Sequence, residues 1–416
     1  MQLMKNRGGK VLIVGGGLAG LACARALHAA SVSCQILEAS DRIGGRVRTD
    51  RVDGFLLDRG FQVLLTASPE VQRLVDPADL EPRAFYPGAR VYHRGRLHTL
   101  ADPRLQPARA LRSLWGPLVT PLDGMRVRRL RRRLQGGSEP PPPERTTLQA
   151  LKRAGFSRRM VERFWRPFLG GIFLETELKT PAVQFERLFR ALAGGQVVLP
   201  AYGMEALPLA LARPLPDDAV RTGARVESLT ATRVTLDSGE SLPARAVVVA
   251  TAGPAAAALQ PGTAGPPSRS TTCLYFAAQR PPFRQPCLVL NGSGQGPVNH
   301  LCVPSVVAPT YSPDDHALIA ASVIGNPPEE DAVLHGQVLE QLSGWFGTQV
   351  STWRLLRIYR IAHALPGTWP ADGGSQEDCR IQQGLYACGD YRGTPSINGA
   401  LRSGRHAAAA VLEDLT

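Results

Sequence analysis

A glycine-rich turn near the start of the chain constrains the fold more than any other feature of the sequence. Residues 11–20 are VLIVGGGLAG, and an alanine-rich run continues to residue 30. The continuously apolar residues 11–14 predict a strand buried on both faces, and residues 18–30 predict a helix. Glycine permits positive φ and lets another group approach the backbone closely. The pattern therefore predicts a βαβ unit that holds a pyrophosphate at the helix N-terminus.

Each glycine of this turn has a predicted task. Gly15 makes the turn, Gly17 lets the pyrophosphate approach, and Gly20 lets the helix pack closely on the strand. A second strand, residues 32–37, ends at Glu38, 21 residues after Gly17, where a carboxylate can accept both ribose hydroxyls and would repel a 2′-phosphate. The neighbours predicted to contact the cofactor with these residues are Leu18, Ala19 and Ala39. The alternative is an ordinary strand, turn and helix with a surface glutamate.

Composition narrows the class of protein. A chain of 416 residues exceeds what one hydrophobic core usually organises, so two domains are expected. The seven cysteines are odd in number and contain no C-x-x-C pair, which predicts reduced intracellular thiols and no metal site. No apolar segment is long enough to cross a bilayer, and the nucleotide motif leaves no room for a signal peptide before it. We therefore expect a cytoplasmic protein.

The formal charge of +13 comes mostly from arginine, because the only lysines are Lys5, Lys10, Lys152 and Lys179. The densest basic run is RVRRLRRRL, residues 126–134. It fits a solvated face or a helix on the inner surface of a membrane. Nothing beside it suggests base recognition, so we expect no nucleic-acid partner. The sequence leaves the oligomeric state open.

The nucleotide-binding half is predicted to be discontinuous. β signals dominate near both chain ends and from residue 196 onward, whereas residues 69–195 have mainly helical spacing. We predict an α/β protein of two domains. A Rossmann-like domain comprises 1–68, 196–266 and 376–416, and a substrate domain with a β-sheet and helices comprises 69–195 and 267–375.

Three groups of residues together resemble a known family. They are VLIVGGGLAGLACARAL through Glu38, the segment DRIGGR, and YACGD…INGALRSGRHAA at the end, with LPAYGMEALPLALA between them. In this order they resemble the superfamily of flavin-dependent amine oxidases, carotene desaturases and protoporphyrinogen oxidases. The resemblance implies FAD on a two-domain fold. The segment RIAHALPGTWP contains no cysteine, so we expect the FAD to be non-covalent.

The resemblance also implies roles for residues outside the first turn. Gly44 and Gly45 let the backbone approach the dinucleotide, and Arg46 offsets pyrophosphate charge. The Val226 main chain would flank adenine. The C-terminal positions implied to contact the ribityl chain, the pyrophosphate or the flavin ring are Gly389, Asp390, Asn398, Gly399 and Ala400. Structural alternatives are a surface charge for Arg46, an N-cap for Asp390 and a packing role for Gly399.

Two departures from the amine oxidase pattern bear on the substrate. Thr272 stands about where those enzymes have a lysine that holds water against the flavin, and Ser396 stands where they place an aromatic wall of the amine cage. Instead, residues 396–404 resemble the S-M-E-G-A…S-G pattern of plant-type carotene desaturases, with Asn398 in place of the acidic residue.

These features predict an FAD-dependent oxidoreductase that moves hydride from a hydrophobic, isoprenoid-like small molecule to flavin N5. The alternatives are an atypical amine oxidase lacking the lysine, and an FAD-containing isomerase or scaffold without net redox turnover. The catalytic residues are not assigned by the sequence. Weak candidates for contact with the substrate are Asp58, Gln62, Tyr202 and Tyr391.

Overall fold

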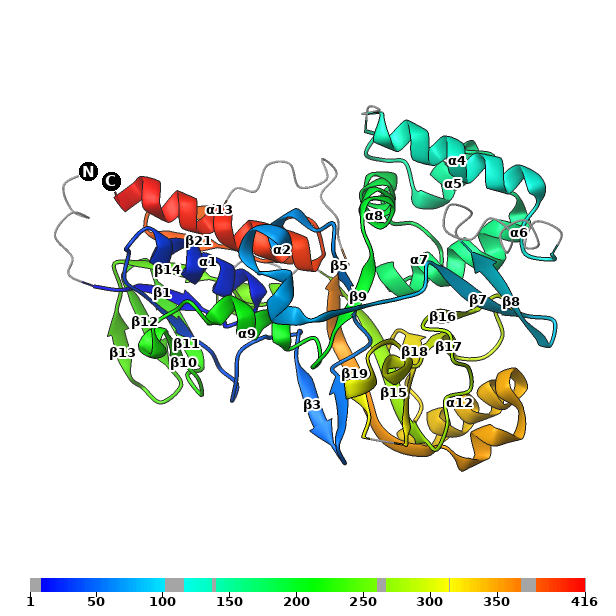
Figure 1. Cartoon of the computed structure of the whole chain (residues 1–416). Helices are drawn as coiled ribbons and strands as arrows, with labels where there is room; N and C mark the ends of the chain where they lie inside the picture. The colour runs from blue at the N-terminus through cyan, green and yellow to red at the C-terminus, as the bar shows by residue number, and fades with distance from the viewer. Residues whose placement is uncertain are drawn as a thin grey trace.

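The structure is a computed structural model that describes residues 9–101, 116–136, 140–259, 267–313, 315–367 and 379–415. It is a mixed α/β protein in which a parallel sheet covered by helices lies beside a second, mainly antiparallel sheet with its own helices (Figure 1). Within the described part of the chain, no helix has the length and apolar character needed to cross a membrane.

The first sheet has six strands drawn from widely separated parts of the chain. Their spatial order is β10 (Val220–Arg221), β2 (Cys34–Leu37), β1 (Val11–Val14), β14 (Ala246–Val249), β21 (Leu385–Ala387) and β20 (Arg380–Gln382). All neighbours run parallel except β20 and β21. The predicted strand at residues 11–14 is confirmed, and every residue in it is buried.

The two faces of this sheet are covered differently. Val11 and Ile13 pack against helix α1 (Leu18–Ala29), whereas Leu12 and Val14 contribute to a separate apolar cluster that contains Val234. That cluster lies under a three-stranded sheet of β11 (Val226–Thr230), β12 (Arg233–Leu236) and β13 (Ser241–Pro243). Because both faces are covered, the strand is apolar at every position rather than at every second one.

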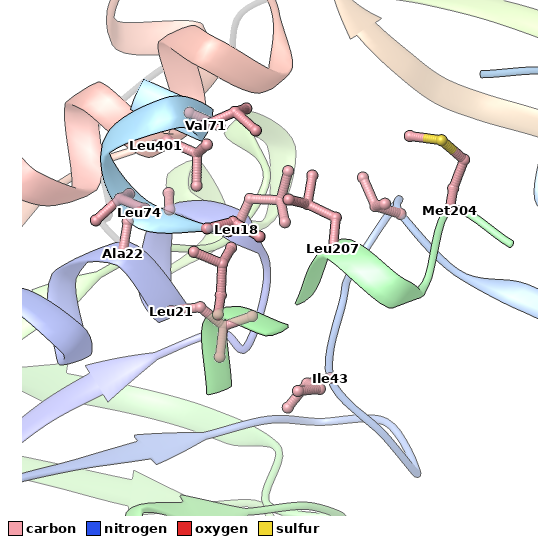
Figure 2. Packing of buried hydrophobic residues seen from close by; sticks show 14 of the residues in the cluster. Leu18, Leu21, Ala22, Ile43, Val71, Leu74, Met204, Leu207 and Leu401 are labelled. Atoms are coloured by element: carbon pink, nitrogen blue, oxygen red, sulfur yellow. The ribbon is translucent and has the colours of Figure 1, made fainter. Parts of the chain in front are cut away.

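The last helix packs on the first. α13 (Ile397–Leu415) lies along α1, and α2 (Pro69–Leu74) and α9 (Ala206–Ala212) join them in one apolar cluster. Figure 2 shows Leu18 and Leu21 of α1 among Val71, Leu207 and Leu401 from the other three helices. The two ends of the described chain are therefore held together in one core.

Gly404 sets how closely α13 approaches α1. A Cβ atom added at Gly404 would lie 2.0 Å from the Ala19 carbonyl oxygen, which is far inside contact distance. We expect Gly404→Ala to push the helices apart and to lower the free energy of unfolding by about 1–3 kcal/mol. Denaturant unfolding measures this. Gly336→Ala is the control, since a Cβ there meets no atom within 4 Å, and an equal loss in both variants would contradict the prediction.

The second sheet has seven strands. Their order is β19 (Arg354–Pro366), β15 (Ser268–Ala278), β18 (Ala317–Ile324), β17 (Val298–Cys302), β16 (Leu288–Asn291), β7 (Gly88–His93) and β8 (Arg96–Ala101). Only β16 and β7 pair in parallel. Helix α12 (Asp331–Phe346) packs on this sheet through Leu334, Val338 and Leu342. Residues 88–101 thus form a hairpin within a region that the spacing predicted to be mainly helical, so that prediction was wrong there.

The helical region forms a third apolar cluster, centred on Trp165. It comprises α4 (Pro121–Gln135), α5 (Thr147–Arg153), α6 (Arg158–Met160), a π-helical turn η2 (Val161–Trp165), α7 (Arg166–Phe173) and α8 (Ala182–Gly194). α4 carries the basic run 126–134. It buries Leu130 and Leu134, whereas Leu122 and Met125 are more than half exposed.

Shorter elements connect these layers. They are the hairpin β3 (Thr49–Val52) and β4 (Phe55–Asp58), a sheet of β5 (Leu64–Leu65), β9 (Val197–Pro200) and β6 (Pro82–Ala84), helices α10 (Gly253–Ala258) and α11 (Pro304–Val307), and 3₁₀ turns η1 (Pro77–Leu80), η3 (Asp217–Ala219), η4 (Pro309–Tyr311), η5 (Gly347–Thr352) and η6 (Asp390–Arg392).

Candidate active site

The glycine turn between β1 and α1 is shaped around open space. Gly15 has φ +110°, which a larger side chain would strain, and a Cβ at Gly20 would lie 2.0 Å from the Gly15 carbonyl oxygen. Gly17 differs, because a Cβ there would meet no atom within 4 Å. Gly17 lies at the N-cap of α1, where free N–H groups and the helix dipole favour an anion. The turn is therefore a cradle that a side chain at position 17 would fill.

A second pair of glycines forms the opposite lip of this cradle. The Gly44 N–H donates to the Gly16 carbonyl oxygen at 2.9 Å, and Gly44 bridges in parallel to Gly17. Gly44 and Gly45 both have positive φ, and a Cβ at Gly45 would lie 3.3 Å from Gly17 Cα. Side chains at these positions would crowd the turn, so both glycine segments are needed to keep the space open.

The carboxylate of Glu38 is fixed at the carboxyl end of β2. Its Oε2 accepts from the Gly16 N–H at 2.7 Å, and its Oε1 accepts from the Ser40 N–H at 2.9 Å and from the Ser40 hydroxyl at 2.7 Å. Glu38 lines a large cavity together with Ala39 and Val226. Only the lone pairs that remain are available to a ribose.

Arg46 and Asp390 meet across the cradle. Arg46 Nη2 donates to Asp390 Oδ1 at 2.6 Å, and Nη1 donates to the Ala364 carbonyl oxygen at 3.0 Å. Both residues line the cavity, as does Gly389, whose N–H donates to the Ser403 hydroxyl at 3.1 Å. The ion pair joins the segment after β2 to the loop before α13, which lies 344 residues further along the chain.

The start of α13 closes this part of the cavity. The Ser396 hydroxyl accepts from the Gly399 N–H at 3.0 Å, so this serine acts as a helix cap. Asn398 Oδ1 accepts from the Glu70 N–H at 3.0 Å and thereby holds the start of α2. A Cβ at Gly399 would lie 1.8 Å from the Thr394 carbonyl oxygen. Ser396, Asn398 and Ala400 all line the cavity.

One continuous cavity of about 2680 Å³ extends from this cradle into the helical region. Its far wall is largely aromatic, with Phe164, Trp165 and Phe168 in contact with one another. The cavity reaches the surface beside α4, because Met125 and Arg128 line it and are themselves exposed.

Positive charge dominates the lining. Ten arginines contribute to it, namely Arg46, Arg59, Arg128, Arg131, Arg187, Arg190, Arg225, Arg357, Arg360 and Arg402, against five acidic residues, Glu38, Asp50, Asp123, Glu227 and Asp390. Asp50 accepts from Arg59 and Tyr359, and Asp123 accepts from Thr120 and Ser157. These two carboxylates are therefore already engaged by donors of the protein.

Two adjacent threonines of β15 lie around the position expected for a lysine. Thr272 was predicted to occupy it, but this side chain is fully buried and donates to the Gly325 carbonyl oxygen at 3.1 Å. Its neighbour Thr271 lines the cavity. The reason is the alternation of side chains along β15, which sends adjacent residues to opposite faces. The cavity wall thus carries a threonine at this point, and no lysine is among the described residues that line it.

His300 of β17 is a polar residue in the wall that the sequence did not single out. It is 7% exposed, and burial lowers its pKa from 6.5 to about 4, so it is neutral at physiological pH. The Asn299 amide nitrogen lies 3.1 Å from its Nδ1, and the Phe61 ring packs edge-on at 5.4 Å between centroids. His300 therefore adds a polar group without adding charge.

Two weak candidates from the sequence lie away from the cavity. Asp58 is 3% exposed, and its carboxylate accepts from the Thr49 hydroxyl, the Met204 N–H and the Tyr311 hydroxyl at 2.6, 2.9 and 2.9 Å. Burial raises its pKa to about 6. It joins the β4 region to residues about 150 and 250 positions later, which is a structural task. Tyr202 is 56% exposed on the surface.

The other two weak candidates have different surroundings. Gln62 lines the cavity, but its Nε2 donates to the Arg46 carbonyl oxygen at 2.8 Å and so supports the loop of the GGR segment. Tyr391 lines a small hollow next to Arg46 and Asp390, and burial raises its pKa. Of the four candidates, only Gln62 borders the large cavity.

A dinucleotide fits the residues that surround the cradle. The open space at Gly17, the helix N-terminus and the fixed carboxylate of Glu38 suit a pyrophosphate and a ribose, and the cavity continues to the start of α13. The parallel sheet and this cradle, with a separate sheet and helices bounding a second compartment, define a dinucleotide-binding protein of two domains.

Comparison with known proteins places the chain in a family. The profile of the flavin containing amine oxidoreductase family matches residues 18–412, and the chain belongs to this family. It is accordingly an FAD-dependent oxidoreductase.

Curated relatives match only over segments. Polyamine oxidase 2 of Arabidopsis thaliana is 49% identical over 57 residues, which is 14% of this chain and 12% of that protein. Putrescine oxidase of Kocuria rosea is 37% identical over 118 residues, or 28% and 25%. Coproporphyrinogen III oxidase of Propionibacterium freudenreichii subsp. freudenreichii is 28% identical over 169 residues, or 39% and 31%. The matched segments thus span less than a third of each of these relatives.

Solved structures match over nearly the whole chain. An oxidoreductase from Methanosarcina mazei superposes with a TM-score of 0.76 at 18% identity, covering 97% of this chain and 100% of that one. A putative protoporphyrinogen oxidase from Exiguobacterium sp. 255-15 gives 0.73 at 21% identity, covering 98% and 99%. Putrescine oxidase bound to putrescine gives 0.70 at 18% identity, covering 97% and 99%. At these identities the likeness shows the fold alone.

Proposed function

We propose that the protein oxidises a large, mainly apolar and isoprenoid-like molecule by hydride transfer to non-covalently bound FAD. The observation that carries this is the cavity of about 2680 Å³, which joins the cofactor cradle to an aromatic wall. Small-molecule sites usually measure about 300–1,000 Å³, so space remains for a second large molecule beside a dinucleotide. When bound, FAD supplies the redox step by accepting hydride at N5.

The residues of this chain supply binding, orientation and the exclusion of water. Gly17 and the α1 N-terminus would hold the pyrophosphate, Glu38 the adenosine ribose, and the positive end of α13 the flavin pyrimidine ring. The other proposed contacts are Gly15, Leu18, Ala19, Gly20, Ala39, Gly44, Gly45, Arg46, Val226, Gly389, Asp390, Asn398, Gly399 and Ala400.

The lining argues against a cationic substrate. Curated relatives include oxidases named for polyamines and putrescine, and these amines are cations at neutral pH. Here the wall presents Thr271 rather than a lysine, Ser396 rather than an aromatic ring, and twice as many arginines as acidic residues. An amine would therefore lack both the aromatic cage and a compensating charge. The relative named for coproporphyrinogen III acts on a larger molecule, which suits the volume better.

The helix α4 supports entry of the substrate from a membrane surface. The cavity opens beside it, and Leu122 and Met125 are 52% and 58% exposed next to the arginines of residues 126–134. Exposed apolar side chains flanked by arginine suit an anionic lipid surface. Peripheral contact with the inner face of a membrane would let an apolar molecule enter without crossing water.

We further propose that the two domains have the boundaries indicated by the sequence. Residues 1–68, 196–266 and 376–416 would form the FAD-binding domain, because every strand of the six-stranded sheet comes from them. Residues 69–195 and 267–375 would form the substrate domain, because they hold the seven-stranded sheet and helices α4 to α8.

Anaerobic reduction of the flavin tests the proposed function. We expect the visible absorbance of the holoprotein to bleach with a carotenoid or other isoprenoid lipid fraction, and to persist with putrescine, spermidine and NAD(P)H. A titration followed at the flavin absorbance maximum measures this. Bleaching by the amines, with the lipid fraction inert, would replace the proposal by an atypical amine oxidase.

A further inference from the structure

His300 lies on the cavity face of the seven-stranded sheet, on the same side as Thr271. On β17 it pairs with Ser322 of β18, and Ser322 pairs in turn with Cys273 of β15, two residues along the strand from Thr271. His300, Ser322 and Thr271 all line the cavity. Adjacent strands are about 4.8 Å apart, so His300 stands roughly 10 Å across the sheet from β15. The imidazole therefore belongs to the wall of the same compartment, two strands from the position expected for a lysine.

Asn299 holds the imidazole of His300 in one tautomer. Asn299 Nδ2 donates to the Pro167 carbonyl oxygen at 2.9 Å, which identifies this atom of the amide as the nitrogen, and it lies 3.1 Å from His300 Nδ1. The second hydrogen of the amide is therefore donated to Nδ1. A neutral imidazole that accepts at Nδ1 carries its hydrogen on Nε2. Burial lowers the pKa of His300 to about 4, so the neutral form is present at physiological pH.

The Nε2–H group of His300 is a buried donor that the protein itself does not satisfy. A Cβ atom added at Gly171 of α7 would lie 2.8 Å from His300 Nδ1 and 3.0 Å from Asn299 Nδ2, so the glycine leaves room for both side chains. Within the part of the chain that the structure describes, no residue accepts a hydrogen bond from Nε2. The residue is 7% exposed. Because a buried donor without an acceptor is unfavourable, such a group in a cavity wall suits a site that a ligand completes.

We infer that the substrate carries an oxygen atom, in a carbonyl or hydroxyl group, that accepts a hydrogen bond from His300 Nε2. Such an oxygen has the lone pair that a neutral N–H donor requires. The apolar body of the substrate lies along Phe164 and Phe168, which stack at 5.4 Å in the wall of the same cavity. His300 thereby selects oxygenated molecules over plain hydrocarbons, since a hydrocarbon leaves the donor unpaired. The inference rests on the proposed function for the apolar, isoprenoid-like part of the substrate and adds the oxygen.

Three ligands with one carbon skeleton test this inference in the holoprotein. They are geranylacetone, which is an isoprenoid ketone, the alcohol formed by reducing its carbonyl group, and the hydrocarbon that lacks the oxygen. Equilibrium dialysis below their solubility limits measures the affinities. In His300→Leu, which removes the donor with little change in side-chain volume, we expect the ketone and the alcohol to lose about three- to tenfold in affinity while the hydrocarbon is unaffected. Equal changes for all three ligands, or no binding of the ketone, would overturn the inference.

Two further variants separate hydrogen bonding from packing. His300→Gln keeps a side-chain donor and should retain most of the ketone affinity. His335→Leu removes a histidine of α12 whose Nε2 also lacks a partner among the described residues, but which does not contribute to the described lining, so all three affinities should stay unchanged. If His300→Gln or His335→Leu loses as much ketone affinity as His300→Leu, the effect is one of packing and the assignment of the donor fails.

Nuclear magnetic resonance of isotope-labelled histidine gives a readout that does not depend on affinity. The signals of His300 are those that disappear in His300→Gln. We expect Nε2 to have the chemical shift of a protonated ring nitrogen and Nδ1 that of an unprotonated one. The Nε2–H resonance should move downfield when the ketone is added and stay in place with the hydrocarbon. An unprotonated Nε2, or one that the ketone leaves unchanged, would contradict the proposed hydrogen bond.

These binding tests are independent of turnover. If the ketone binds through His300 as expected but no lipid fraction reduces the flavin, the inference about His300 stands and the proposed function fails. If lipids reduce the flavin but His300→Leu binds the ketone as tightly as wild type does, the proposed function stands and the inference fails.

Discussion

Gly17→Val is expected to yield a folded protein that retains almost no FAD. A Cβ atom added at residue 17 meets no protein atom within 4 Å, and the φ of −76° is one that valine adopts freely. The space that it fills is the one in which a pyrophosphate would approach the α1 N-terminus. We expect FAD affinity to fall by about a hundredfold or more, with little change in the secondary structure. Flavin absorbance relative to protein absorbance, together with circular dichroism, measures both.

Two other glycines provide the controls for this experiment. Gly336 lies on the exposed side of α12 with open space around it, so Gly336→Val should keep its flavin. Gly20→Ala should instead destabilise the fold itself, because the added Cβ would overlap the Gly15 carbonyl oxygen at 2.0 Å. If Gly17→Val keeps a full complement of flavin, the cofactor lies elsewhere and the assignment of the cradle is wrong.

The parts of the fold that the sequence could predict depend on local patterns. The strand, turn and helix at residues 11–29 follow from a short apolar run and glycines whose steric limits act within a few residues. Glu38 ends β2 for a similarly local reason, and the resemblance in the last forty residues indicated that the chain returns to the first sheet. Each of these signals spans one or two elements.

The parts that the sequence could not predict depend on which face a side chain occupies. Thr271 and Thr272 are adjacent and chemically identical, and only the register of β15 against its neighbours sends the first of them to the cavity. Asp58 follows a glycine-rich segment that the resemblance places near flavin. Its actual partners, Met204 and Tyr311, lie so far along the chain that no pattern links them.

The sequence likewise could not show which arginines line the cavity. The run at residues 126–134 is conspicuous in the sequence, yet of its arginines only Arg128 and Arg131 line the cavity. Arg187 joins them from α8, and its helix carries no basic run that would attract notice. The packing of the helices determines which arginines face the cavity. Composition therefore predicts a basic protein, and only the tertiary structure shows which of its arginines line the cavity.

Asp58→Asn is expected to change how stability depends on pH, in the opposite direction to His300→Gln. Burial raises the Asp58 pKa from 3.8 to about 6, so the folded protein binds more protons than the unfolded chain between these values, and its stability falls as pH rises. Burial lowers the His300 pKa from 6.5 to about 4, so the folded protein binds fewer protons, and its stability rises with pH. The two contributions oppose each other in the wild type.

Each substitution removes one titrating group, so the pH dependence of stability in that variant reflects the other group. Asparagine can still accept from Thr49 and Met204, and its amide can donate to the Tyr311 hydroxyl, so the contacts of Asp58 are retained. From pH 4 to pH 7 the unfolding free energy of Asp58→Asn, relative to wild type, should rise by roughly 3 kcal/mol, and that of His300→Gln should fall by a similar amount. Urea unfolding across this pH range measures both differences. Parallel profiles for the two variants would show that burial of these groups does not control their protonation, and would remove the argument that His300 is neutral in the cavity wall.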